Sequence, residues 1–181
     1  MVQYIDDFAK SLLEESKHFL EKCDEHGDQI ANTAYLHAAL MLAFCSLEAH
    51  VNMISDEFAN SADISLHDKG ILLERDVHLD DGRFVLTPAP KIIRLEDRIQ
   101  FLHTRFSGKA LDRNEVWWSR LSDATKLRNQ LTHPREHILI KPEAVERALK
   151  AVIDTIDALY RALYKRPFPV AIRGLTSELT F

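Results

Sequence analysis

The sequence predicts an all-α protein, a bundle of about five helices with one small β-hairpin inserted between them. Apolar residues recur at helical spacing in five long segments. The 5 glycines and 6 prolines are too few for a loop-rich or all-β design. Hydrophobic residues make up 46% of the 181 residues and charged residues 28%. These values fit one globular domain over residues 1–181, with a loose tail at about 167–181.

Two helices are expected in the first third of the chain. Residues 3–25 place apolar side chains on one face, and Gly27 is expected to close this helix. Residues 29–58 form a longer helix that is apolar nearly all round. Such a helix must be covered on several sides, either by the rest of the bundle or by a second subunit.

The β-hairpin is expected at about 73–87. Apolar and polar residues alternate from Val77, and Asp81-Gly82 is a strong signal for a tight turn. Pro88 and Pro90 are expected to stop the second strand, because proline has no backbone N–H to donate.

The next helix is expected at about 91–106. Pro90 suits the first turn of this helix, and Ser107-Gly108 suits its end.

Two further helices follow. Asp112 and Glu115 have the spacing of a capping box, which predicts a helix over about 113–132 that Pro134 ends. The last helix is expected at about 142–164, opened by the proline at its first position.

Cysteine use and the N-terminus favour a soluble cytoplasmic protein. Cys23 and Cys45 form no CxxC pair and fit reduced packing positions. The N-terminus lacks the basic start and apolar run of a signal peptide. Residues 29–47 carry no formal charge over about the length of a membrane span, but polar residues interrupt them and Glu48 follows. A buried bundle helix explains this segment better than a membrane helix.

Charge is unevenly spread along the chain, whose net charge is −5. Residues 1–90 carry 6 basic and 17 acidic side chains, a net of −11, whereas residues 91–150 carry 13 basic and 8 acidic, a net of +5. The net negative charge of the whole chain argues against binding to long DNA, whereas the basic segment permits binding of a phosphate-bearing ligand. Alternatively, the two parts simply attract each other.

The segment RNQLTHP combines three side chains at the end of the 113–132 helix. Asn129 and His133 are one turn apart and share a face, while Arg128 lies roughly 140° from His133 on an ideal helix. Because Pro134 breaks the helix, an arginine, an amide and an imidazole can converge there. Two other patterns, an ExxH spacing at Glu15 and a pair of thiol and imidazole ligands at Cys23, lack the second half that a metal site needs. No metal or cofactor is expected.

A second polar feature interrupts the apolar helix of residues 29–58. Glu48 and Asn52 are one turn apart and share a face. A carboxylate buried there needs a cation, for which Arg128 is the first candidate, with Asn129 as a further partner. The pair would orient two packed helices whether or not the protein is an enzyme.

RNQLTHP resembles the R-x4–6-H motif of the HEPN superfamily, and FCSLEAHVN resembles the acidic helix that precedes it. The resemblance covers about residues 1–165, with the hairpin as an insertion. It implies a HEPN-like helical bundle that forms a homodimer, with the arginine and histidine of two subunits facing each other. Carried over, Arg128 and His133 match the catalytic motif, Asn129 matches its usual polar companion, and Glu48 matches the acidic residue of the preceding helix. Asn52, one turn from Glu48, is a further supporting residue.

The resemblance implies a metal-independent endoribonuclease, of the kind found among toxins and defence effectors, with RNA and an inhibitor or antitoxin as partners. RNA carries its own nucleophile in the ribose 2′-OH, so an imidazole and a guanidinium suffice in principle. Arg135 stands where toxins with a nucleotidyltransferase antitoxin often have tyrosine, which argues against that pairing. The alternative is a non-catalytic HEPN module that binds RNA, a nucleotide or a protein partner.

Overall fold

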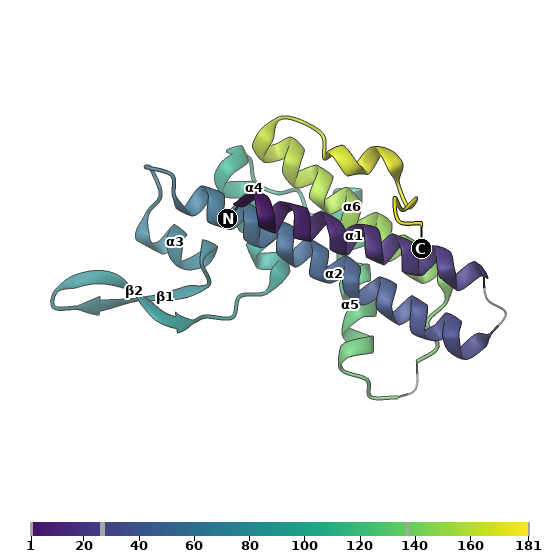
Figure 1. The fold of residues 1–181 in the computed structure, drawn as a ribbon. Coiled ribbons are helices and arrows are strands. Elements are labelled where there is room, and N and C mark those ends of the chain that lie inside the picture. Colours follow the sequence, from purple (N-terminus) through teal and green to yellow (C-terminus); the bar gives the residue numbers. More distant parts are fainter. Residues whose placement is uncertain (1, 26–27, 137, 181) are drawn as a thin grey trace.

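The computed structural model describes residues 2–25, 28–136 and 138–180, and in these the chain is mostly helical with one two-stranded antiparallel sheet. Figure 1 shows the arrangement of the elements. In chain order they are α1 (Val2–Glu25), α2 (Gln29–Ala59), α3 (Leu66–Leu72), β1 (Arg75–Asp80), β2 (Arg83–Pro90), α4 (Leu95–Ser107), α5 (Val116–Thr132), α6 (Pro142–Tyr164) and a 3-10 helix, η1 (Pro169–Arg173).

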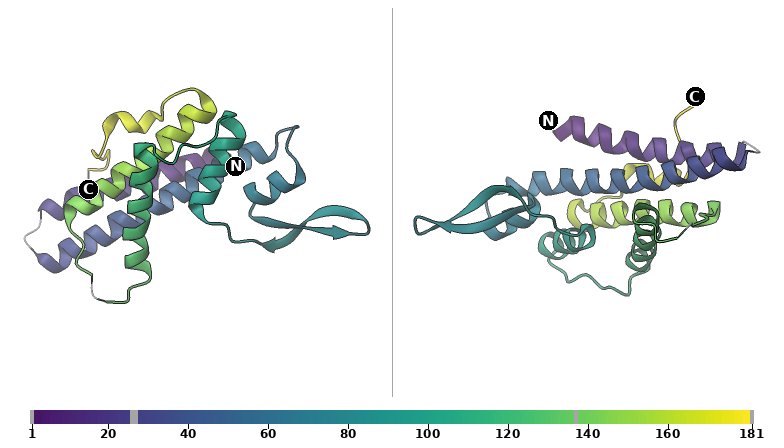
Figure 2. Two further views of the ribbon diagram at one scale, coloured as in Figure 1. Left: turned by 180° about the vertical axis from the view of Figure 1, so that it is seen from behind. Right: turned by 90° about the horizontal axis from the view of Figure 1, so that it is seen from below.

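Helices α1, α2 and α6 form the body of the bundle. They lie alongside one another, while α4 and α5 cross them steeply (Figures 1 and 2). Hydroxyls join α1 to α2 within the apolar core: Ser16 Oγ donates to the Ala39 carbonyl at 2.7 Å, and Ser46 Oγ donates to the Ala9 carbonyl at 2.8 Å. The largest fully buried apolar side chains come mainly from these three helices, among them Leu13, Leu40, Leu47, Ile54, Leu149 and Ile156.

The predicted bounds of α1, α2 and α6 are confirmed to within one residue. Asp28 caps α2, because its side chain accepts the N–H of Ile30 at 2.9 Å. Gly27, the expected end of α1, lies outside the described residues. Helix α2 is long and apolar enough to cross a membrane by length and composition, a test that the core helix of a soluble protein also passes.

The β-hairpin is present and projects from one end of the bundle (Figure 1). Asp80 pairs with Arg83 across the expected turn, and both Asp81 (φ 45°) and Gly82 (φ 78°) are left-handed, as such a turn requires. The second strand does not stop before its prolines but continues to Pro90. An edge strand tolerates proline, because the missing N–H would face away from the partner strand.

A short helix, α3, precedes the hairpin and was not expected. Ser65 and Asp68 form a capping box, in which Ser65 Oγ accepts the N–H of Asp68 at 3.0 Å and Asp68 Oδ2 accepts the N–H of Ser65 at 3.3 Å. The SLHD pattern at this position was the available signal.

Helices α4 and α5 begin later than predicted. Helix α4 starts at Leu95 rather than about 91, because β2 uses Pro90, and it ends at Gly108, which is left-handed at φ 73°. Helix α5 starts at Val116 rather than 113. Asp112 caps a preceding turn instead, where its Oδ1 accepts the N–H of Asn114 at 2.9 Å.

The C-terminal segment is packed rather than loose. Phe168 is fully buried, and Arg173 donates to Glu14 Oε1 on α1 at 2.9 Å. The N–H of Glu178 donates to Glu14 Oε2 at 2.7 Å, and Ser177 Oγ donates to the Glu14 carbonyl at 2.9 Å. The sequence did not predict this packing, because the few residues that hold the segment do not recur at the spacing of a helix or a strand.

Candidate functional site

The end of α5 positions His133 where the sequence placed it. The last helical hydrogen bond runs from the His133 N–H to the Asn129 carbonyl at 2.9 Å, and His133 leaves the helical conformation at φ −130° and ψ 60°. Pro134 follows and offers no N–H to continue the ladder. The His133 side chain is exposed, so its imidazole is accessible to a ligand.

Asn129 and His133 border one hollow of about 740 Å³. The loop after α5 closes its other side with Arg135, Glu136, Ile138 and Leu139. The expected approach of the amide and the imidazole is therefore present in the single chain. This space, referred to below as the His133 hollow, contains a neutral amide, an imidazole and charges of both signs.

Arg128 does not line the His133 hollow. Its guanidinium carbon lies 5.1 Å from the centre of the Phe44 ring on α2, a cation–π contact. Its Nε is buried and has no hydrogen-bond partner among the residues that the structure describes. Among the described residues, no carboxylate lies within salt-bridge distance of Arg128. Convergence of Arg128 with His133 is thus absent within one chain.

Glu48 is exposed rather than buried, so the expected buried ion pair with Arg128 is wrong for the single chain. Within the described part of the chain, Glu48 makes no hydrogen bond to Asn129 and no salt bridge. The physical reason is that α1 and α6 leave one face of α2 uncovered, and Glu48 and Asn52 lie on that face, both exposed.

The charges of Glu48 and Arg128 nevertheless act on the same thiol. Burial raises the pKa of Cys45, and the negative charge of Glu48 raises it further, whereas the Arg128 guanidinium lowers it. Cys45 is on the same uncovered face of α2, while Cys23 is buried. Arg128 and Glu48 therefore lie near the same stretch of α2, whereas Asn129 and His133 line the hollow at the end of α5.

Asn52 borders a different hollow, of about 490 Å³, that contains an arginine the sequence analysis missed. Arg98 is only 6% exposed. It donates to Glu74 Oε2 at 2.9 Å and to Ser55 Oγ at 3.3 Å, while its Nε has no partner. Burial lowers the pKa of Arg98, and the charges of Glu74, Glu48 and Asp56 oppose this. Its place within the apolar stripe of α4 was the available signal.

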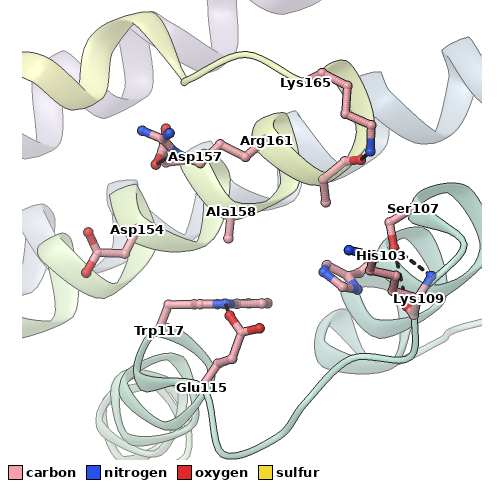
Figure 3. Close-up of a pocket in the computed structure, with 11 residues that line it drawn as sticks. His103, Ser107, Lys109, Glu115, Trp117, Asp154, Asp157, Ala158, Arg161 and Lys165 are labelled. Atoms are coloured by element: carbon pink, nitrogen blue, oxygen red, sulfur yellow. Dashed lines mark hydrogen bonds and ion pairs between the residues drawn. The ribbon is translucent and has the colours of Figure 1, made fainter.

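A further hollow of about 500 Å³ lies between the end of α4, the start of α5 and α6 (Figure 3). The Trp117 indole forms one wall and donates to Glu115 Oε2 at 2.5 Å. Burial lowers the pKa of His103 on the facing side, although Glu115 and the Lys109 backbone oppose this. Three cations (Lys109, Arg161, Lys165) balance three carboxylates (Glu115, Asp154, Asp157), so charge gives this hollow no preference for an anion.

Among the described residues, no group of three or more histidine, cysteine, aspartate or glutamate side chains is placed to hold a metal ion. No family of known proteins, no curated protein and no solved structure matches the chain.

Proposed function

We propose that the protein is a cytoplasmic, metal-independent endoribonuclease of HEPN type that acts as a homodimer, with His133 and Arg128 in the catalytic roles. The observation that carries this proposal is the exposed imidazole of His133 at a helix end, one turn from Asn129 and open to the His133 hollow. The unneutralised guanidinium of Arg128 supports it, since a cation without a carboxylate partner is available to a phosphate.

The chemistry follows from these groups. The ribose 2′-oxygen attacks the adjacent phosphorus while one imidazole takes the 2′-OH proton. The bond from phosphorus to the 5′-oxygen breaks, and a second, protonated imidazole gives its proton to that oxygen. Acid–base catalysis of this kind contributes roughly 10²–10⁴-fold. A guanidinium stabilises the charge that develops on the phosphate oxygens.

Two subunits are required by this mechanism, because one chain supplies one His133 and points Arg128 toward α2 instead. The arginine of one chain must therefore approach the histidine of the other. Asn129 would hold the phosphate or the sugar beside His133, since its side chain is exposed at the same hollow.

The test is incubation of purified wild type, His133→Ala and the control His78→Ala with mixed RNA in excess chelator. His78 is an exposed histidine on β1, in the hairpin, so its replacement removes an imidazole from a different part of the molecule. Wild type and the control should cut RNA to 2′,3′-cyclic phosphate and 5′-hydroxyl ends and leave DNA intact, because DNA lacks the 2′-OH. His133→Ala should cut RNA at a rate at least about 100-fold lower than that of wild type. Equal cutting by all three proteins would refute the assignment.

The second candidate is a non-catalytic HEPN module that binds RNA, a nucleotide or a protein partner. The observation that favours it is the separation of Arg128 from the His133 hollow in the single chain. Wild type that binds RNA in the same assay but never cuts it would favour this candidate.

A further inference from the structure

A further hollow opens onto the α5–α6 side of the molecule, next to the His133 hollow. It has a volume of about 570 Å³, and α5 and α6 line it from both sides. Lys126 and Gln130 border this hollow and the His133 hollow alike. The two hollows therefore adjoin along Lys126 and Gln130, and together they are called here the α5–α6 groove. Along α5 the groove extends from Arg120 past Gln130, at least about 15 Å of helix.

The groove is strongly basic within an acidic protein. Its five cations are Arg120, Lys126, Arg135, Arg147 and Lys150, and its two carboxylates are Asp123 and Glu136, a net of +3. The whole chain has a net charge of −5. Such a local excess attracts a polyanion to this face while the rest of the surface repels it.

Three of these cations, Arg135, Arg147 and Lys150, have no carboxylate at salt-bridge distance among the described residues. Lys126 donates to Asp123 at 2.8 Å, and Arg120 donates to Asp154 at 3.2 Å. Arg147 and Lys150 on α6 are exposed, and within the described part of the chain neither has a carboxylate at salt-bridge distance. Both are free to contact a ligand, and neither contributes an ion pair to the fold.

The floor of the groove is small and aliphatic. Ala124, Leu127, Ala144 and Ala148 line it, and no phenylalanine, tyrosine or tryptophan is among the described residues that line the groove. Stacking on aromatic side chains is the usual means of holding unpaired bases. A floor of this kind therefore fits contact with a sugar–phosphate backbone and gives no base preference.

We propose that the α5–α6 groove holds the phosphate backbone of a single RNA strand whose neighbouring phosphodiester lies at His133. The inference rests on the proposed function in taking the strand to be RNA that reaches His133. It assigns Arg147 and Lys150 as phosphate-binding residues outside the catalytic machinery. The five cations of the groove are among the 13 basic residues of the segment 91–150.

The test compares two double variants with the same loss of charge. Arg147→Gln with Lys150→Gln removes two groove cations. Arg75→Gln with Arg83→Gln removes two exposed cations from the hairpin, which projects away from α5 and α6 (Figure 1). Fluorescence anisotropy measures the binding of a labelled single-stranded RNA between about 50 and 200 mM salt. All proteins carry His133→Ala so that no RNA is cut during the measurement.

The groove variant should bind more weakly and with less dependence on salt. For a single strand, each phosphate that the protein no longer neutralises lowers the slope of log K against log salt by about 0.7, so two such phosphates lower it by about 1.4. Affinity near 0.1 M salt should fall roughly 25-fold. The hairpin variant should bind as its parent does. Equal affinities and slopes for the two double variants would overturn the proposal.

Cleavage separates this proposal from the proposed function. With His133 restored, a dinucleotide that reaches only the His133 hollow should be cut equally by wild type and the groove variant, whereas a longer strand should be cut more slowly by the variant. If wild type binds RNA through the groove but cuts nothing, the groove stands and the nuclease assignment fails. If wild type and the groove variant cut both substrates at the same rates, the nuclease assignment holds and the proposed role of the groove is refuted. Displacement of RNA by polyglutamate of equal charge, at equal concentration, would also refute the groove proposal. It would indicate that the groove binds an acidic protein segment instead of RNA.

Discussion

Arg128 makes its main contact within the chain with an aromatic ring, not with a carboxylate. The guanidinium lies over Phe44, whose side chain is 2% exposed, so part of Arg128 belongs to the packing between α5 and α2. His133, by contrast, is exposed beyond the last turn of α5. The two residues of one motif therefore differ in what their removal does to the fold.

Replacement of these two residues should change the stability of the fold to different extents. Arg128→Ala should lower the free energy of unfolding by about 1 kcal/mol, because it removes a partly desolvated cation–π contact. His133→Ala should change it by less than about 0.5 kcal/mol, because an exposed side chain at a helix end carries little packing. Urea unfolding of both variants measures this. A larger loss for His133→Ala than for Arg128→Ala would contradict the assignment of Arg128 to the α2–α5 contact.

The motif residues also show how far sequence reasoning could go. Helical spacing placed Asn129 and His133 on one face, and the structure brings both to the His133 hollow. The same reasoning predicted that Glu48 is buried, because α2 is apolar nearly all round. The neighbouring helices, however, leave one face of α2 uncovered, and Glu48 is exposed on it. Periodicity reports that a segment is apolar but not which neighbour covers each side. That information depends on the crossing of helices distant in sequence, as does the rotation of Arg128 toward Phe44.

Helix α3 shows how a short element depends on local capping. It has seven residues, too few to be stable alone, and its capping box and a contact to α4 hold it. Burial acts to raise the pKa of Asp68, but hydrogen bonds from Ser65 and Arg105 outweigh it and lower the pKa below the ordinary 3.8. The ionised form of Asp68 is therefore favoured in the folded state.

This lowered pKa predicts an acid-dependent contribution to stability. Because the folded pKa is below the unfolded one, the contribution is complete above about pH 4 and is lost as pH falls through the folded value. Asp68→Asn should cost roughly 1 kcal/mol at pH 7, the scale of a cap interaction, and less as the solution becomes acidic. The control Asp63→Asn removes the same charge from an exposed side chain near α3. Unfolding curves at neutral and acid pH measure both, and an equal cost of Asp68→Asn at each pH would refute the explanation.

Glu14 on α1 makes several of the contacts that hold the C-terminal segment. Glu14 is 7% exposed and accepts hydrogen bonds from Lys17 at 3.1 Å, Arg173 at 2.9 Å and the Glu178 N–H at 2.7 Å. Lys17 is fully buried, and burial lowers its pKa although Glu14 opposes the shift. Removal of the Glu14 side chain would leave a buried ammonium without this carboxylate and would remove the contacts to Arg173 and the Glu178 N–H, while the Ser177 N–H still donates to Glu21 Oε1 at 2.9 Å.

Glu14→Ala should therefore lower the free energy of unfolding by about 3–5 kcal/mol, the usual cost of breaking a buried ion pair. Glu15→Ala is the matched control, because Glu15 is the next residue of α1 and, among the described residues, accepts a hydrogen bond only from the Ser11 hydroxyl, at 3.0 Å, in a partly exposed position. It should change stability by less than about 0.5 kcal/mol. Limited proteolysis should cut the C-terminal segment of Glu14→Ala earlier than that of wild type. Similar unfolding curves for the two variants would show that Glu14 does not hold this segment.

At the scale of the whole molecule, the uncovered face of α2 predicts the dimer. Its members recur every three or four residues, each exposed or half-buried, in the order Ala34, Ala38, Met41, Cys45, Glu48 and Asn52. The first four are apolar and the last two are polar. Glu48 on this face, and Arg128, whose guanidinium contacts Phe44 of the same helix, have no salt-bridge partner among the described residues. A two-fold contact here would cover the apolar half and bring the unpaired charges of both chains into one interface.

Wild type should therefore sediment as a dimer at micromolar concentration, and Met41→Glu should sediment as a monomer, because two carboxylates would be buried in the contact. Leu79→Glu is the matched control, since Leu79 is 61% exposed on the hairpin and its replacement adds the same charge elsewhere. It should remain a dimer. Alkylation of Cys45 gives an independent readout: the thiol should react faster in Met41→Glu than in wild type. A dimeric Met41→Glu with unchanged Cys45 reactivity would place the interface elsewhere, and a monomeric wild type would remove the two-subunit requirement on which the proposed nuclease depends.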